Sequence, residues 1–372
     1  MATKTLMKGN EAIVRGAIAG GCRGFFGYPI TPQNEIPEYM SALMPKIGGA
    51  FVQAESEVAS INMVYGAAST GARVMTTSSS PGISLMQEGI SYIATAELPA
   101  VIVNVQRGGP GLGNIAASQA DYFQTVKGGG HGDYKLLTLA PWSITECYNF
   151  TAMAFDLADK YRAPVMILAD AIIGQMIEQI EVPEKVETHL VEKPWATNGC
   201  KGRKKNVINS LYIVPKDLEE MNLKLQAKYA LMSENEVRFE KTQTDDADLV
   251  IVAYGATARI SKTAIDLARK EGLKVGLFRP ISLFPYPSAE LLEMAEQGKK
   301  FLTVEMSHGQ MLEDVKLAVN GKAEVSFYGR SGGMVPNPLE VLDKIRELVG
   351  KSNGSCGCGC CCGKGKKMEV SK

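Results

Sequence analysis

Hydrophobic residues in the first half of the chain form short unbroken runs, separated by stretches with Gly and Ala at helical spacing. The runs predict five β-strands, at residues 24–28, 49–53, 74–78, 100–105 and 164–169. Because these runs do not alternate with polar residues, we expect strands covered on both faces, as in a parallel sheet. Helices are predicted at 57–70, 83–96 and 143–161. The pattern therefore predicts a layered α/β domain over residues 1–182.

The pattern changes after residue 182. Residues 183–246 are rich in Lys and Glu, and we interpret them as a connector with one amphipathic helix at 216–239. A second, smaller α/β domain is predicted over 247–349, from apolar runs at 248–255, 274–278 and 300–305 and a helical stretch at 256–271. The tail, residues 350–372, is rich in Gly, Cys and Lys. We expect it to be disordered, because such a segment buries too little apolar surface.

Composition narrows the class of protein. A length of 372 residues suits two domains. The 40 basic and 40 acidic residues cancel, so neither nucleic acid nor an anionic membrane is an expected partner. No apolar stretch has the length of a membrane span, and the N-terminus lacks a secretion signal, so we expect a soluble, cytoplasmic protein. Scattered cysteines suit that compartment and imply no disulfide framework.

A loop between two prolines follows the first predicted strand. In Tyr-Pro-Ile-Thr-Pro, residues 28–32, the prolines restrict the backbone on both sides of Thr31. Ligands of open α/β sheets bind at the carboxyl ends of strands, which makes Thr31 a candidate contact for a small polar substrate. The alternative is a rigid turn in which Thr31 only caps the next helix.

A carboxylate opens the helix that follows the second predicted strand. Glu57 lies in the first helical turn, and Val58, Ile61, Val64 and Ala68 would form the inward stripe. The simpler interpretation is a carboxylate that complements the helix dipole. The functional alternative is a partly buried acid that pairs with a ring nitrogen of a ligand.

A glycine-rich segment follows the strand at 100–105. Its four glycines, within residues 108–113, allow a ligand to approach the backbone closely, and Arg107 beside them is suited to a two-pronged grip on a carboxylate. A phosphate-binding loop is disfavoured, because the Lys-Ser/Thr ending is missing and GxGxxG is not matched.

Two further segments carry reactive groups. Residues 127–134 place His131 in a flexible loop, either as part of a lid over a substrate or as a solvated side chain. The three histidines are far apart in sequence, so no metal site is predicted from them. The tail holds five cysteines between 356 and 362, without the CxxCxxC spacing of a ferredoxin cluster. Soft-metal capture, a redox-labile tether and no specific role remain alternatives for the tail.

Taken together, several motifs resemble the alpha subunit of 2-oxoacid:ferredoxin oxidoreductases. They are YPITP at 28–32, QAESE at 53–57, TTSSSPG at 76–82, QRGGPGLGN at 106–114, GGGHGDY at 128–134, FRPISLFPYP at 278–287 and VEMSHGQMLEDV at 304–315. The resemblance extends from residue 8 to residue 349. Within the family, the branched-chain type, which acts on 3-methyl-2-oxobutanoate, is the most similar, followed by the 2-oxoglutarate type.

The resemblance implies a fold, a reaction and residue roles. The first domain would be the pyrimidine-binding module of thiamine diphosphate enzymes, and the second would resemble the transketolase C-terminal domain. The family decarboxylates a 2-oxoacid oxidatively with coenzyme A, giving an acyl-CoA, carbon dioxide and reduced ferredoxin. Glu57 would hydrogen-bond the cofactor's aminopyrimidine, with Pro29 and Ser80 also at the cofactor. Thr31 and Arg107 would hold the carboxyl end of the 2-oxoacid, and His131 would lie near it.

The resemblance also implies partners. The GDG segment that binds diphosphate and magnesium in thiamine enzymes is missing, as are cluster-binding cysteines. A beta subunit would then carry the diphosphate and Mg site, and gamma and ferredoxin-like delta subunits would complete the complex with its iron-sulfur clusters. The helices around 59–72 and 83–96 are the expected contacts with the beta subunit. Two other classes remain as rivals, a non-catalytic scaffold and a metal-handling protein.

Overall fold

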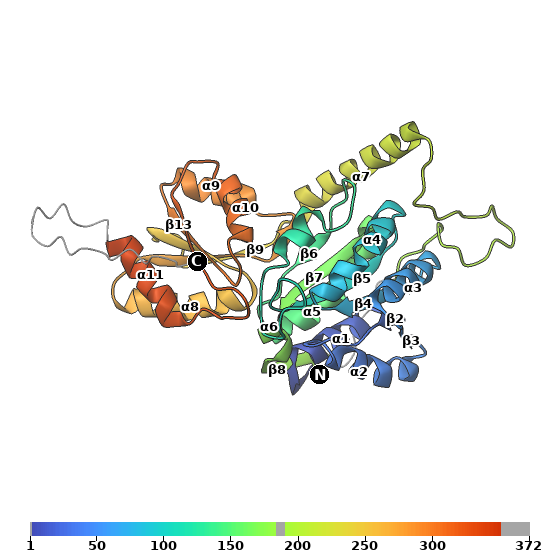
Figure 1. Ribbon diagram of the computed structural model, residues 1–372, viewed down its shortest axis with the longest axis horizontal. Helices are drawn as coiled ribbons and strands as arrows, with labels where there is room; N and C mark the ends of the chain where they lie inside the picture. Colours follow the sequence, from blue (N-terminus) through green and yellow to red (C-terminus); the bar gives the residue numbers. More distant parts are fainter. Residues whose placement is uncertain (1, 184–189, 351–372) are drawn as a thin grey trace, which may run out of the picture.

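The computed structural model describes residues 2–183 and 190–350 and shows two α/β units side by side (Figure 1). The first is built on a seven-stranded sheet in the order β12-β6-β7-β5-β4-β2-β3. Six of these strands are parallel to one another: β2 (Gly24–Gly27), β3 (Ala50–Gln53), β4 (Val74–Ser78), β5 (Ala100–Gln106), β6 (Leu137–Leu139) and β7 (Pro164–Asp170). Every residue of β4, β5 and β7 is buried, which confirms the predicted parallel sheet with both faces covered.

The helices of the first unit are α1 (Gly9–Ala19), α2 (Glu35–Leu43), α3 (Glu57–Ser69), α4 (Pro81–Thr95), α5 (Ile144–Tyr161) and the short α6 (Ala171–Gln175). Among them, α1 packs against α5, and α3 packs against α4. One sequence expectation for α3 was wrong. Val58 is 44% exposed, because Glu57 itself takes the inward position that starts the buried stripe through Ile61, Val64 and Ala68.

The second unit is a five-stranded sheet in the order β14-β13-β10-β11-β9. Its parallel strands are β10 (Leu249–Val252), β11 (Val275–Pro280), β13 (Lys300–Glu305) and β14 (Val325–Gly329), while β9 (Phe239–Thr242) is antiparallel. Its helices are α8 (Gly255–Lys270), α9 (Ser288–Glu296), α10 (Gln310–Val319) and α11 (Pro338–Gly350). Figure 1 shows α8 and α11 on one side of this sheet and α9 and α10 on the other. This is the second α/β domain that the sequence predicted.

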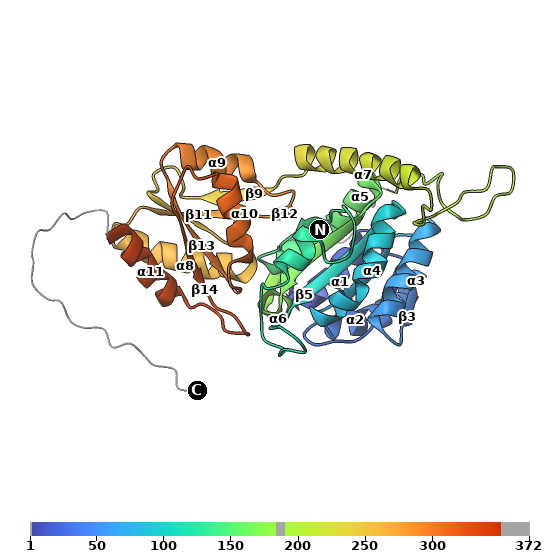
Figure 2. The ribbon, with the colours of Figure 1, turned by 45° about the horizontal axis from the view of Figure 1, so that its top comes forward.

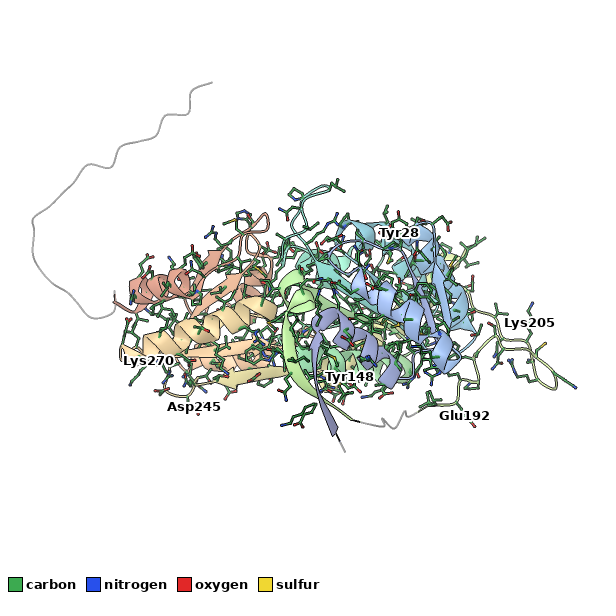
Figure 3. All side chains as sticks on the ribbon, turned by 90° about the horizontal axis from the view of Figure 1, so that it is seen from below. Tyr28, Tyr148, Glu192, Lys205, Asp245 and Lys270 are labelled. Atoms are coloured by element: carbon green, nitrogen blue, oxygen red, sulfur yellow. The ribbon has the colours of Figure 1, made fainter. Side chains whose placement is uncertain are left out.

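The connector is partly structured. Its helix α7 (Pro215–Asn235) runs along the first unit (Figure 2), where Lys228 pairs with Glu97 at 2.7 Å and Gln226 donates to the Asp133 carbonyl at 2.8 Å. The predicted helix 216–239 extends too far, because Phe239 begins strand β9. Residues 190–214 form no helix or strand, and Figure 3 places Lys205 at the end of the molecule opposite the second unit.

A strand pairing joins the two units. Strand β12 (Ser282–Phe284) follows the second unit's β11 in sequence but pairs antiparallel with β6, at the edge of the first sheet. Strands β1 (Ala2–Lys8) and β8 (Ile177–Pro183) form a separate antiparallel pair. Within the described ranges, no helix is both long and apolar enough to cross a membrane. The predicted disorder of the tail concerns residues 351–372, which lie outside the described residues.

Candidate functional site

The candidate site lies where parallel strands of the first sheet end. Strands β2, β4 and β5 are linked through parallel neighbours, so the loops after them meet at one edge. The loop after β2 carries Thr31, the turn after β4 carries Ser80, and β5 leads directly into Arg107. The edge thus brings together three residues that are far apart in the sequence.

Glu57 is a buried carboxylate at the start of α3, with 5% of its surface exposed. Ser56 caps this helix by accepting a hydrogen bond from the Ala59 amide at 3.2 Å. The one hydrogen bond to the Glu57 carboxylate from the described residues comes from the Ser78 hydroxyl, at the long distance of 3.5 Å. A buried carboxylate with so little compensation is costly in an apolar setting, so this geometry leaves Glu57 available for a ligand.

Arg107 is also buried, with 7% of its surface exposed, and its guanidinium links two loops. It donates to the Thr31 carbonyl at 2.8 Å and to the Leu112 carbonyl at 3.1 Å. Its Nε is buried without a hydrogen-bond partner among the described residues. The structure therefore joins Thr31 and Arg107, as the sequence motifs suggested, and leaves a donor of the guanidinium unused.

Thr31 is half-buried and is contacted by two polar side chains, those of Asn34 and Arg107. Its hydroxyl accepts a hydrogen bond from the Asn34 side chain at 3.1 Å, so the hydroxyl hydrogen remains to be donated. The loop around it is fixed from below by Gln33, a fully buried residue whose amide oxygen accepts from the Thr77 hydroxyl at 2.6 Å. Sequence analysis missed this role of Gln33, because nothing in the motif shows that its side chain reaches β4.

Ser80 occupies a strained turn between β4 and α4. Its φ of 23° lies in the left-handed region that side chains other than that of glycine rarely adopt. The Arg107 amide donates to its hydroxyl oxygen at 3.0 Å, and the Asn104 side-chain oxygen accepts from the Ser80 amide at 3.1 Å. Strained backbone of this kind persists where its surroundings hold it, often at functional sites.

Asp121 and Asn104 complete the site, and sequence analysis did not identify either. Asp121 Oδ2 accepts from the Ser80 hydroxyl at 2.6 Å and from the Asn104 amide at 2.9 Å. Burial raises the pKa of the Asp121 carboxyl, while these two hydrogen bonds and the charge of Arg107 oppose the rise. No sequence signal could have found Asp121, since the role depends on contacts among three segments.

Other predicted residues lie at or beyond the rim. Pro29 is exposed beside Tyr28, and Leu112 is 82% exposed. His131 is exposed in a loop whose neighbouring Gly130 packs against α4 at Gln87, about two turns along the helix from its start. The described contacts do not bring His131 to Thr31 or Arg107. Among the residues that the structure describes, no three His, Cys, Asp or Glu side chains gather in a way that could hold a metal ion.

The fold and the site define a two-domain α/β protein with a buried carboxylate and a buried guanidinium at one sheet edge. Residues 15–244 match the family model for the thiamine-diphosphate-binding domain of pyruvate flavodoxin/ferredoxin oxidoreductases. Residues 247–341 match the model for core domain II of pyruvate:ferredoxin oxidoreductase. The chain belongs to the family of 2-oxoacid:ferredoxin oxidoreductase subunits, as its motifs indicated.

Curated relatives agree with this assignment. The chain is 54% identical to a ketoisovalerate oxidoreductase subunit, VorB, of Methanothermobacter marburgensis, over 95% of this chain and 100% of the relative. It is 39% identical to a 2-oxoglutarate synthase subunit, KorA, of the same organism, over 93% of this chain and 99% of the relative.

Solved structures show the same fold. A 2-oxoglutarate:ferredoxin oxidoreductase of Magnetococcus marinus, solved with 2-oxoglutarate, coenzyme A and succinyl-CoA, superposes with a TM-score of 0.84 at 28% identity. The match covers 93% of this chain and 65% of that one. A split-gene transketolase superposes with a TM-score of 0.59 at 13% identity, over 92% of this chain and 98% of that one, which supports the fold alone. The predicted thiamine-enzyme fold is thereby confirmed.

Proposed function

We propose that this chain is the alpha subunit of a 2-oxoacid:ferredoxin oxidoreductase and supplies the pyrimidine-activating carboxylate and the substrate's carboxylate anchor. The observation that carries the proposal is the buried Glu57 carboxylate, whose one hydrogen bond from the described residues is 3.5 Å long. Glu57 opens the helix that follows β3, and Arg107 follows β5 of the same sheet, with its buried Nε left without a partner among the described residues. A scaffold that had lost its chemistry would have no need of these two incompletely paired buried groups.

The residues at this edge fit the pyrimidine half of thiamine diphosphate. Glu57 offers a carboxylate oxygen, while Gly82 carries no side chain that would fill the space beside that oxygen. Pro29 and Ser80 lie on the loops after β2 and β4, and the proposal assigns them to cofactor contacts. When bound, thiamine diphosphate supplies the carbanion chemistry by which a 2-oxoacid loses carbon dioxide.

Glu57 would act by holding a proton at the ring nitrogen of the aminopyrimidine. A carboxylate there stabilises positive charge on the ring, and burial excludes the water that would weaken this interaction. Because Ser78 donates only a long hydrogen bond, the carboxylate keeps its capacity to accept one from a ligand. The role depends on the charge of Glu57, so an amide in its place would fail.

Thr31 and Arg107 would bind the carboxylate of the 2-oxoacid. Arg107 uses two of its five N–H donors on the Thr31 and Leu112 carbonyls, so its guanidinium and the hydroxyl hydrogen of Thr31 offer donors from two loops that already contact each other. Charge-assisted hydrogen bonds of this type fix both the position and the orientation of a carboxylate. His131 would contact the substrate only if its loop approached this edge.

Partner subunits would complete the site. The rim of the sheet edge exposes apolar side chains that suit a protein interface: Tyr28, Val52, Val58, Leu85, Leu112 and Ile115. Val58 and Leu85 belong to α3 and α4, the helices expected to face the beta subunit. In the proposal that subunit binds the diphosphate and magnesium, gamma and ferredoxin-like delta subunits carry iron-sulfur clusters, and ferredoxin takes the electrons. The buried, unbridged thiols of Cys22 and Cys147 suit a cytoplasmic complex.

The proposed substrate is 3-methyl-2-oxobutanoate, converted with coenzyme A to the acyl-CoA, carbon dioxide and reduced ferredoxin. The higher identity to the ketoisovalerate subunit, 54% against 39% for the 2-oxoglutarate subunit, supports this choice. Leu112 and Ile115, the large exposed side chains of the glycine-rich segment, are apolar and suit an alkyl substrate better than a second carboxylate.

The role of Glu57 is tested by Glu57→Gln in the assembled complex, with Glu55→Gln as a matched control on an exposed neighbour. We expect Glu57→Gln to lower kcat for ferredoxin reduction by a factor on the order of 10²–10⁴, the usual contribution of a positioned acid or base. Glu55→Gln should retain wild-type turnover. Wild-type turnover by a Glu57→Gln complex that contains no wild-type subunit would refute the proposed function.

The substrate is tested by measuring kcat/KM of the same complex for 3-methyl-2-oxobutanoate, 2-oxoglutarate and pyruvate. We expect the branched-chain substrate to be preferred. A preference for 2-oxoglutarate would keep the family assignment and reverse the substrate assignment.

A further inference from the structure

We propose that Asp121 is a positioning residue for the Arg107 anchor, and that the second unit controls the substrate site through Asp121. This inference rests on the proposed function of Arg107. It concerns a residue that touches neither the proposed substrate donors nor Glu57, yet joins the segments that set the backbone of Arg107.

Asp121 holds the Ser80 turn from two directions. One oxygen, Oδ2, accepts from the Ser80 hydroxyl at 2.6 Å and from the Asn104 amide at 2.9 Å. Asn104 in turn accepts from the Ser80 amide at 3.1 Å. Asp121, Asn104 and Ser80 thus form a closed ring of hydrogen bonds that includes the Ser80 amide, and this ring holds the strained backbone of Ser80 in place.

Ser80 passes this constraint to Arg107. Its hydroxyl oxygen accepts from the Arg107 amide at 3.0 Å and lies 3.3 Å from the Arg107 carbonyl oxygen. Asp121 orients that hydroxyl by taking its hydrogen at 2.6 Å. The Arg107 main chain is thereby fixed directly below the guanidinium that reaches Thr31.

The segment that carries Asp121 is held by the second unit. On one side of Asp121, the Gln119 amide donates to the Met306 carbonyl at 2.9 Å, and its buried side-chain oxygen accepts from the Met306 amide at 3.0 Å. Gln310 spans Asp121: it accepts from the Phe123 amide after Asp121 at 2.8 Å and donates to the Ala120 carbonyl before Asp121 at 2.7 Å.

Asp314 of the second unit makes two further contacts with the same segment. The buried Tyr122 hydroxyl donates to Asp314 at 2.6 Å, and Lys127 pairs with the same carboxylate. Met306, Gln310 and Asp314 all belong to the motif at 304–315, which the proposed chemistry does not use. The second unit therefore contacts residues 119–127 on both sides of Asp121 and holds this segment in place.

A carboxylate is needed in the ring because both neighbours donate to it. Both donors bond to Oδ2, where an asparagine could place its amide oxygen, but that oxygen carries no charge and would accept both hydrogen bonds more weakly. The replacement would therefore loosen the Ser80 hydroxyl or the Asn104 amide while keeping almost the same volume. The expected consequence is a displaced Arg107, not a lost fold.

The test uses the assembled complex with Asp121→Asn, and Asp266→Asn on the exposed face of α8 as its control. We expect Asp121→Asn to raise KM for the 2-oxoacid about tenfold, roughly the effect of one lost charge-assisted hydrogen bond, with a smaller change in kcat. The affinity for a competitive inhibitor that carries the carboxylate should fall by the same factor. The corresponding carboxamide inhibitor should bind as to wild type.

A second variant, Gln310→Ala, removes contacts of the second unit with this segment without changing Asp121, and Gln297→Ala, at the exposed residue that follows α9, is its control. Gln310→Ala should also raise KM for the 2-oxoacid. In the double variant with Asp121→Asn, the increase in KM should be smaller than the product of the increases in the two single variants. Unchanged KM in both variants, or equal weakening of the carboxylate and carboxamide inhibitors, would overturn the inference. Arg107→Ala separates the two proposals. If Arg107→Ala raises KM and Asp121→Asn does not, only this inference fails. If Arg107→Ala leaves KM unchanged, both proposals fail.

Discussion

Gly82 packs directly against the Glu57 carboxylate. A β-carbon on Gly82 would lie 2.4 Å from Glu57 Oε1 and 2.0 Å from the Ser78 hydroxyl oxygen, far inside contact distance. Because both atoms are ends of side chains, Gly82→Ala should displace them instead of breaking α4. We expect a stability loss of about 1–3 kcal/mol, typical of an overpacked core, and a larger effect on turnover, since a small misplacement of a catalytic group costs on the order of 10²-fold.

Gly66→Ala is the matched control for this prediction. Gly66 lies in α3 with no atom within 4 Å of its would-be β-carbon, so alanine should stabilise the helix by about 0.5–1 kcal/mol and leave turnover per assembled complex unchanged. The measurements are the thermal midpoint of the purified subunit and kcat of the assembled complex. Equal turnover of the Gly82→Ala and Gly66→Ala complexes would argue against a catalytic role for the space beside Glu57.

Arg107→Lys should keep the charge but lose the anchor. A lysine ammonium cannot reach the Thr31 and Leu112 carbonyls and also present a planar donor, as the guanidinium does. We expect KM for the 2-oxoacid to rise by about ten- to a hundredfold, equivalent to about 1.4–2.8 kcal/mol. Arg15→Lys on the exposed face of α1 should have no effect. Steady-state kinetics of the assembled complex checks both variants.

The sequence predicted those parts of the fold that depend on local pattern. Strands at 74–78 and 300–305 have the predicted bounds, because most of their residues are apolar or β-branched, as is typical of strands. Strand β12 was not predicted, since its three residues become a strand only by pairing with β6 of the other unit. The predicted helix 216–239 ran past Asn235 for a related reason: Phe239 belongs to the sheet of the second unit.

The candidate site was likewise predicted only in part. Motif positions placed Thr31 and Arg107 at strand ends, and the structure joins them through a hydrogen bond of 2.8 Å. Asp121 and Gln33 gain their roles from side-chain contacts across 41 and 44 residues of sequence, which no local pattern records. Packing between segments determines these contacts, so they become visible only in the folded chain.

Asp170 gives the junction of the units a pH dependence. Its buried carboxylate accepts from the Ile173 amide of α6 at 3.1 Å and from the Ala256 amide of α8 at 2.8 Å. Burial raises its pKa to about 6, against the opposing effect of these hydrogen bonds. The folded protein thus holds this proton more tightly than the unfolded chain, so the group's stabilising effect is present at about pH 4 and is lost as the pH rises through about 6.

Asp170→Asn should therefore remove one component of the pH dependence of unfolding. Between about pH 4 and pH 6, the wild-type free energy of unfolding should fall relative to that of the variant by about 3 kcal/mol at most. Urea unfolding at several pH values measures this difference, with Asp266→Asn on exposed α8 as the control. Parallel curves for the wild type and Asp170→Asn would show that Asp170 has an ordinary pKa.

Arg279 should be the main electrostatic link between the units. Its guanidinium, 2% exposed, donates to Glu146 of α5 at 2.7 and 2.9 Å and to Glu240 of β9 at 2.8 Å, and it stacks over the Trp142 ring at 4.3 Å. Arg279→Met keeps the side-chain length but leaves both carboxylates without this partner. Removing one partner of a buried pair costs about 3–5 kcal/mol, and because Glu240 is 41% exposed we expect about 2–4 kcal/mol here.

The matched surface variant is Arg346→Met, which breaks a pair with Glu271 in which both side chains are 40% or more exposed. Its cost should stay below about 1 kcal/mol, since solvent screens such pairs. Thermal unfolding of the two variants should differ accordingly, and added salt should narrow the Arg346→Met difference while leaving that of Arg279→Met nearly unchanged. Equal, salt-sensitive losses in both variants would mean that Arg279 behaves as a surface charge and is not a main link between the units.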